Sequence, residues 1–169
     1  MSPLRFPVVV VMERLPLANR WVSARWQPGA VVPVHDADAA AVPGTPACIA
    51  DGPEGTAWSY PGHSVELHPS EGEGYYLNLT SPEPKAFVMW RLADDGEEPA
   101  ARVVVVTLSY NQAARMLDGG ESVDAVPLAR ELFDWMKPFV EEHYRPEPRQ
   151  KLRRNDPFRE DGPRRGPRG

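Results

Sequence analysis

Glu66 and His68 are the residues whose types and spacing most directly invite chemistry. They lie two positions apart in "VELHP", and residues two apart on a strand project from the same face. A carboxylate and an imidazole placed side by side could bind a metal ion or relay a proton. The nearest third ligand, His63, falls on the opposite face by the same alternation. The alternative is a solvated outer strand face, and we predict no metal site.

Aromatic and basic residues form a second set with chemical potential. Proteins that bind single-stranded nucleic acid stack bases on aromatic rings beside arginines. We instead predict that these aromatic residues are core, because the chain is acidic and they occur at strand spacing. Tyr75 and Tyr76 are neighbours, so one of them is expected at the surface. The set comprises Trp21, Trp26, Tyr75, Tyr76 and Trp90, with Arg25 and Arg91.

Cys48 is the single cysteine of the chain, which rules out an internal disulfide and a cysteine-based metal cluster. An activated thiol needs a nearby histidine or a helix N-terminus, and the local sequence supplies neither. We therefore expect a buried, inert cysteine in a reducing compartment. The N-terminal apolar run ends at Glu13, too early for a signal peptide. No segment has the roughly 20 apolar residues of a membrane span, so a cytoplasmic location is expected.

Charge is distributed unevenly along the 169 residues. Residues 145–169 carry nine basic and four acidic side chains, while residues 1–144 carry ten basic and twenty acidic ones. An acidic body disfavours nucleic acid and acidic membrane surfaces as partners. The basic tail could attract either of them or an acidic protein, fold back on its own body, or only aid solubility. We expect the tail to be disordered, because it holds few apolar residues. Its candidate partner-binding residues are Arg145, Arg149, Lys151, Arg153 and Arg154.

The first two thirds of the chain read mainly as strands. Runs of valine and other β-branched or aromatic residues predict strands at 6–14, 21–26, 29–34, 75–81, 86–92 and 101–108, with a short one near 47–50. A turn is expected at Pro28-Gly29, and Pro61-Gly62 predicts a hairpin of 56–61 with 63–69. Residues 82–84 are expected to join another hairpin, and residues 93–99 to form an acidic turn.

Two helices are expected near the C-terminus. Ser109 and Gln112 have the spacing of a capping box, and Gly119-Gly120 ends that helix, predicted over 109–120. Residues 126–144 carry apolar side chains at helical spacing, with Asp124 as the expected cap and a kink expected at Pro138. The sequence thus predicts one α+β domain over 1–144. Its antiparallel sheet should have about five to seven strands, as a partial barrel in one arrangement, with the two helices packed on it.

Four blocks of sequence resemble a known bacterial family. They are "VVVVMERLPLANRWVSARWQPGAVVP", "VELHPSEGEGYYLNLTSPEPKAFVMWRL", "VVTLSYNQAARMLDGGESVDAVPL" and "WMKPFVEEHYRPEPRQKLRRNDPF". Together they are similar to the domain of unknown function 3305 family, from about residue 6 to residue 158. The resemblance implies genes near those of molybdenum-dependent formate dehydrogenases, and no particular activity.

The resemblance favours an accessory or interaction protein, without a catalytic role, for the assembly, maturation or regulation of a formate dehydrogenase. Formate dehydrogenase subunits would be its partners, and no cofactor is expected. The alternative is an enzyme or binding protein for a molybdopterin-type cofactor, as some family members are described. That role needs a glycine-rich phosphate loop, which "ERLPLANRW" lacks. It would otherwise need a basic pocket of Arg20, Arg25, Lys85 and Arg91 around Trp21, Trp26 or Trp90.

Overall fold

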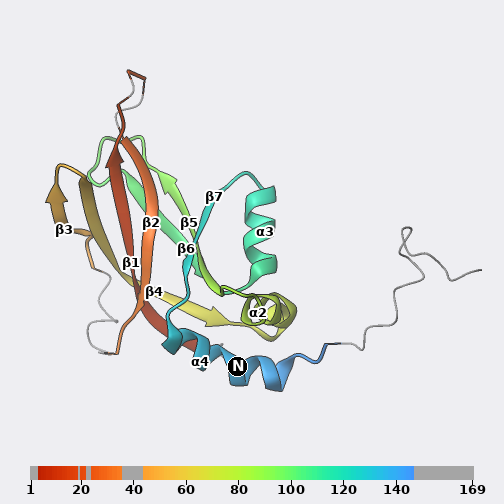
Figure 1. The fold of residues 1–169 in the computed structure, drawn as a ribbon. Coiled ribbons are helices and arrows are strands. Elements are labelled where there is room, and N and C mark those ends of the chain that lie inside the picture. The colour runs from red at the N-terminus through yellow and green to blue at the C-terminus, as the bar shows by residue number, and fades with distance from the viewer. Residues whose placement is uncertain (1–3, 19, 22–23, 36–43, 147–169) are drawn as a thin grey trace, which may run out of the picture.

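The computed structural model describes residues 4–18, 20–21, 24–35 and 44–146. Within them the chain forms seven strands, three α-helices and one short 3-10 helix (Figure 1). The strands make two antiparallel sheets, one of four strands and one of three. This confirms the α+β class, with the strands divided between two sheets.

The four-stranded sheet has the order β2-β1-β4-β3. Its strands are β1 (Leu4–Pro16), β2 (Ala24–Pro33), β3 (Ala47–Gly52) and β4 (Gly55–Leu67). The valine run of β1 alternates, because Val8, Val10 and Met12 are buried while Val9 and Val11 are half-buried on the other face. Partial cover on both faces explains why the run is continuously apolar.

Two predicted turns are bulges inside continuous strands. Pro28-Gly29 lies within β2, where the register against β1 shifts by one residue between Val11 and Met12. Pro61-Gly62 lies within β4, so the predicted hairpin of 56–61 and 63–69 was wrong. Pro61 and Gly62 together lie opposite Val9, since Tyr60 pairs with Val10 and His63 with Val8. A proline without an N–H group and a glycine at φ +87° suit an unpaired bulge as well as a turn.

The three-stranded sheet has the order β6-β5-β7, with β5 (Lys85–Leu92) between β6 (Ala101–Thr107) and β7 (Ser122–Pro127). The sequence prediction missed β7 and assigned its end to the last helix. That helix, α4 (Arg130–His143), begins later, after Ala129, so Asp124 does not cap it. Asp124 instead lies on β7, where its Oδ2 accepts a hydrogen bond from Trp90 Nε1 at 2.8 Å. Pairing with β5 stabilises a strand whose six residues are too few to show a clear period.

The strand predicted over 75–81 is a helix. Residues Pro69–Glu71 form the 3-10 helix η1, and α2 (Gly72–Leu79) follows directly. Tyrosine and leucine favour strands in isolation, but tertiary packing overrides that preference here. Tyr75 and Asn78, three residues apart, are both buried on one side of α2. Asn78 bonds to both backbone groups of Lys85 and to Leu108 O, which ties α2 to the ends of β5 and β6.

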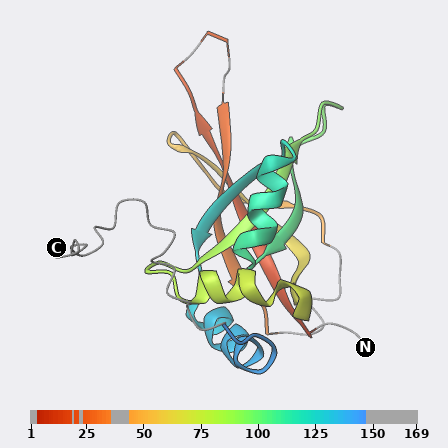
Figure 2. The same ribbon diagram turned by 90° about the vertical axis from the view of Figure 1, so that its right-hand side faces the viewer.

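The two sheets enclose one hydrophobic cluster, which includes Val10, Leu67, Val88 and Val126. Along the sides of the cluster, β2 lies beside β7 and β4 beside β6. Helix α3 (Tyr110–Asp118) packs on the outer face of the three-stranded sheet, while α2 and α4 close one end of the molecule (Figures 1 and 2). As predicted, the Ser109 side chain caps α3 by accepting a hydrogen bond from Gln112 N.

Candidate functional site

Glu66 and His68 lie together at the end of β4, as their spacing predicts. Glu66 Oε1 is 3.2 Å from His68 Nε2, and its other oxygen pairs with Arg5. They line a polar hollow of about 230 Å³ between β4 and β6, which His63 also lines. Burial lowers the pKa of His63. Among the described residues no three His, Cys, Asp or Glu side chains are grouped to hold a metal ion.

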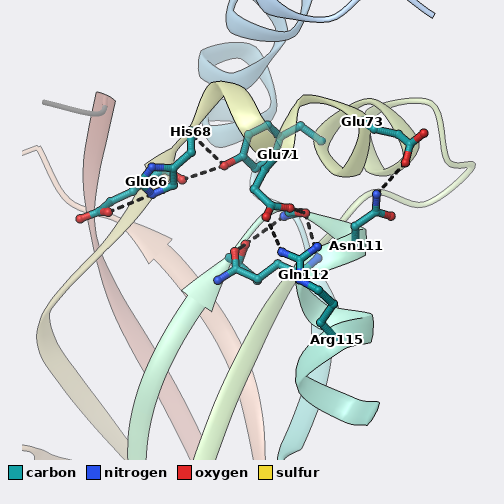
Figure 3. Close-up of polar contacts among 10 residues, drawn as sticks. Glu66, His68, Glu71, Glu73, Asn111, Gln112 and Arg115 are labelled. Carbon is teal, nitrogen blue, oxygen red and sulfur yellow. Dashed lines mark hydrogen bonds and ion pairs between the residues drawn. The ribbon is translucent and has the colours of Figure 1, made fainter. Parts of the chain in front are cut away.

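Glu71 is the centre of a polar junction between η1, α2 and α3. Its Oε1 accepts a hydrogen bond from Ser109 Oγ at 2.7 Å, and its Oε2 pairs with Arg115. Alongside, Asn111 Nδ2 donates to Glu73 Oε1 at 2.8 Å. Figure 3 shows Glu71 between the Glu66–His68 pair on one side and the Glu73–Asn111 pair on the other.

The backbone around the junction is also held by side chains. Tyr75 Oη accepts a hydrogen bond from His68 N at 2.9 Å and donates to Glu66 O at 3.3 Å. Burial raises the pKa of Tyr75 to about 12. Thr107 Oγ1 donates to Gln112 Oε1 and accepts from Ser109 N. The polar side chains therefore form hydrogen bonds with one another and with the backbone, as expected of side chains that hold elements of the fold together.

The junction does not have the arrangement of a nucleophilic site. Ser109 is fully buried, and its hydroxyl donates to a carboxylate. In the part of the chain that the structure describes, the Ser109 hydroxyl bonds to Glu71 and to Gln112 N and to no histidine. A serine nucleophile needs a base that takes its proton and is itself oriented by a third group. The geometry is that of a serine that caps a helix.

The predicted aromatic residues are mostly in or against the core. Trp26 and Tyr75 are buried, and Trp90 and Tyr76 pack against the hydrophobic cluster. Trp21 differs, because 83% of its surface is exposed near the end of the β1–β2 hairpin. These side chains therefore do not form a shared stacking surface.

The basic side chains proposed for a cofactor pocket are dispersed. Arg20 lies over the Trp21 ring at 6.0 Å, and Arg25 is exposed on β2. Lys85 begins β5, and Arg91 lies six residues further, roughly 20 Å away along an extended strand. Arg91 makes two hydrogen bonds to Glu121, and Lys85 lies 3.9 Å from Glu83. The four cations are not gathered around one tryptophan, so this arrangement does not support a molybdopterin-type pocket.

The predicted cysteine and the basic residues of the tail lie apart from these sites. Cys48 is exposed on the edge strand β3, so the expectation of a buried cysteine was wrong. Edge position explains this, because all six residues of β3 are exposed. Arg145 is exposed after α4, whereas Arg149, Lys151, Arg153 and Arg154 lie outside the described residues.

Sequence reasoning missed an apolar groove on the outer side of the three-stranded sheet. Two hollows of about 620 and 220 Å³ meet there, because Phe87 and Tyr110 line both of them. Their rings pack edge to face, with centroids 6.1 Å apart. We call this surface the β5–α3 groove. Its lining includes Leu77, Pro82, Glu83, Lys85, Phe87, Tyr110, Ala114, Leu117 and Asp124.

The β5–α3 groove leaves several large apolar side chains exposed to solvent. Leu77, Tyr110 and Leu117 are 42%, 55% and 54% exposed although each is a large side chain. Exposed apolar residues are ordinary when single, but a contiguous set often marks an interaction surface. The sequence signal for it is weak, since Leu117 and Tyr110 read simply as the two ends of a short helix.

Comparison with models of known protein families identifies the family to which the chain belongs. The family model described as "Protein of unknown function (DUF3305)" matches residues 7–153, which is most of the chain. The chain belongs to the DUF3305 family. No curated protein and no solved structure matches it. The DUF3305 match extends beyond the last described residue, Pro146, into the basic tail.

The described helices of this DUF3305 member are all too short or too polar to cross a lipid bilayer. The longest, α4, has 14 residues and carries charged side chains along its length.

Proposed function

We propose that this DUF3305 protein is an accessory protein without catalytic activity of its own, which binds a protein partner through the β5–α3 groove. The observation that supports it is the apolar, solvent-open lining of the groove, with Tyr110 and Leu117 more than half exposed. The contrast with the polar junction supports the same proposal, since the side chains there are bonded to one another.

The chemistry of the groove defines the partner segment. Large apolar side chains would fill the hollows around Phe87 and Tyr110. Glu83 and Asp124 line the groove, and residues 1–144 carry twice as many acidic as basic groups. The proposed partner segment therefore has apolar residues flanked by lysine or arginine, because opposite charges speed and orient association.

We propose that the partner belongs to a formate dehydrogenase system, and the family resemblance is what supports this choice. The accessory role would concern assembly, maturation or regulation of that enzyme, in the cytoplasm. Bound cofactor is not part of the proposal, because Lys85 and Arg91 are at opposite ends of β5 and each faces a carboxylate.

The test is an affinity pull-down from native lysate, with formate dehydrogenase subunits identified by mass spectrometry and bound pterins assayed. Leu117→Asp places a charge in the groove, and Leu92→Asp is its control. Leu92 is also an exposed leucine, at 60%, and does not line either hollow. We expect the subunits with the wild type and with Leu92→Asp, and their loss with Leu117→Asp. Absence of the subunits, equal recovery with both variants, or a bound pterin in their place would refute the proposal.

A further inference from the structure

The β5–α3 groove lies close to the point where the described chain ends. Tyr144 packs against Gly72 and against the Tyr76 ring, whose centroid is 5.1 Å from its own. Both partners belong to α2, and Leu77, on the last turn of α2, lines the groove. Helix α2 has eight residues, about 12 Å at the usual rise. The chain therefore leaves α4 within one short helix of the larger hollow.

The segment that follows has the length and the side chains to reach and fill the groove. Residues 147–158 read "EPRQKLRRNDPF", and twelve residues span up to roughly 40 Å when extended. Leu152 and Phe158 are the large apolar residues of the tail. Lys151, Arg153 and Arg154 surround Leu152, so the segment has the apolar and basic character that the groove requires.

Charge complementarity favours contact within the chain. Residues 145–169 have a net charge of +5, whereas residues 1–144 have a net charge of −10. Glu83 and Asp124 provide carboxylates in the groove itself. In 0.1 M salt the attraction between such charges acts over about 10 Å. A segment tethered to the body can bring its charges within that distance.

The extent of the family match supports a role for the start of the tail. The DUF3305 match continues through Leu152 to residue 153. This part of the tail therefore belongs to the sequence pattern of the family, along with the strands and helices of the body.

We propose that residues 147–158 fold back on their own body and occupy the β5–α3 groove when no partner is bound. Leu152 fills the larger hollow near Leu77, and Phe158 fills the smaller hollow near Leu117. Lys151, Arg153 and Arg154 then lie among the carboxylates of the groove. The tail is a competitor for the surface to which the partner binds, and in this sense the inference rests on the proposed function. The contact itself exists in the isolated chain.

The first test is carbodiimide cross-linking of the purified full-length chain, with the products mapped by mass spectrometry. Lys151 is the single lysine of the tail, so its cross-links report where the tail lies. We expect links from Lys151 to Glu83 or Asp124. A mixture of chains with and without ¹⁵N separates links within one chain from links between two. Links spread over carboxylates elsewhere on the body, or links that join two copies, would overturn the proposal.

The apolar part of the contact is tested by a double variant, Leu152→Asp with Phe158→Asp. Both positions lie outside the described fold, so the body is expected to remain folded. The links from Lys151 to the groove should fall roughly tenfold, as expected when a well-packed apolar contact is lost. The matched control, Leu92→Asp, should leave them unchanged. An unchanged yield in the double variant would show that charge alone attracts the tail and would overturn the proposed docking.

The two proposals fail in different ways. Truncation after Pro146 should increase the recovery of formate dehydrogenase subunits, because it removes the competitor. If no subunits are recovered with either the full or the truncated chain, the proposed function fails, and the cross-links still decide the tail contact. If subunits are recovered equally with both chains, the tail is not a competitor and this inference fails.

Discussion

Gly74 on α2 packs against Ser109 and Asn111 at the start of α3, and its replacement by alanine tests the packing of the junction. A methyl group at position 74 would lie 2.0 Å from Ser109 Oγ and 3.1 Å from Asn111 N. Ser109 is fully buried. Either Ser109 changes rotamer or α2 moves away from α3, and both movements break the contacts of the Ser109 hydroxyl.

Opposing effects determine the size of the change. Alanine is favoured over glycine inside a helix by about 1 kcal/mol. Loss of the cap from Ser109 to Gln112 N costs about 1 kcal/mol. Loss of the bond to the Glu71 carboxylate costs about 2 kcal/mol. We therefore expect Gly74→Ala to lower the free energy of unfolding by about 2 kcal/mol, opposite in sign to its effect in an exposed helix.

Urea unfolding of the purified variant measures this difference. Gly119→Ala is the control, because its methyl group would find its nearest neighbours at 3.5 Å, an ordinary contact distance. In the Ser109→Gly background the clash with Oγ is absent, so Gly74→Ala should there cost little or be stabilising. A coupling energy near zero between the two positions, or a more stable Gly74→Ala single variant, would refute the close packing of α2 on α3.

Three further predictions concern buried polar groups. Asn78→Ala should lower the free energy of unfolding by about 3 kcal/mol, because three hydrogen bonds to the backbone are lost, and urea unfolding would show it. Since burial lowers the pKa of His63, the unfolded chain binds more protons below about pH 6.5, and stability should fall as the pH decreases. His63→Gln should flatten that dependence in urea titrations at several pH values. Burial raises the pKa of Tyr60 and Tyr75 to about 12, so stability should be lost as the pH rises from 10 towards 12. Phenolate absorbance of the folded chain would show these two tyrosines ionising late, and their ionisation near pH 10 would contradict the burial.

Local sequence patterns predicted the elements whose signals agree with their surroundings. The valine runs of β1 and β6 are β-branched and bounded by turn residues, so propensity and packing point the same way. The capping box of α3 is a local hydrogen bond between Ser109 and Gln112. It depends on residues three apart, which the sequence places together without help from the fold.

The sequence predictions were wrong where tertiary contacts determine the local structure. Composition favoured a strand over 75–81, but a helix there buries Tyr75 and Asn78 together against the sheets. A Pro-Gly pair indicates a break in pairing, and sequence alone does not separate a turn from the bulge at Pro61-Gly62. The short strand β7 exists because β5 provides its partner.

Among the candidate sites, too, local patterns were predictable from the sequence and contacts between distant residues were not. The Glu66–His68 pair follows from the period of a strand, and the structure confirms it at 3.2 Å. Glu71 meets Ser109 and Arg115 across 38 and 44 positions of sequence, so no local pattern reveals that junction. The β5–α3 groove depends on how α3 sits on its sheet, which periodicity does not specify.

The strand order β2-β1-β4-β3 constrains how the chain folds during synthesis. Strand β1 pairs with its neighbour β2, but its second partner is β4, which brings Leu4 opposite Leu67. Such distant pairing makes folding slow compared with helical domains of similar size. A nascent chain that ends at Leu67 would hold every strand of the larger sheet, yet none of the residues from the second sheet, α2 and α4 that complete the hydrophobic cluster with Val8, Val10 and Met12. For the time needed to add the rest of the chain, that apolar sheet face would be open to chaperones and to other nascent chains.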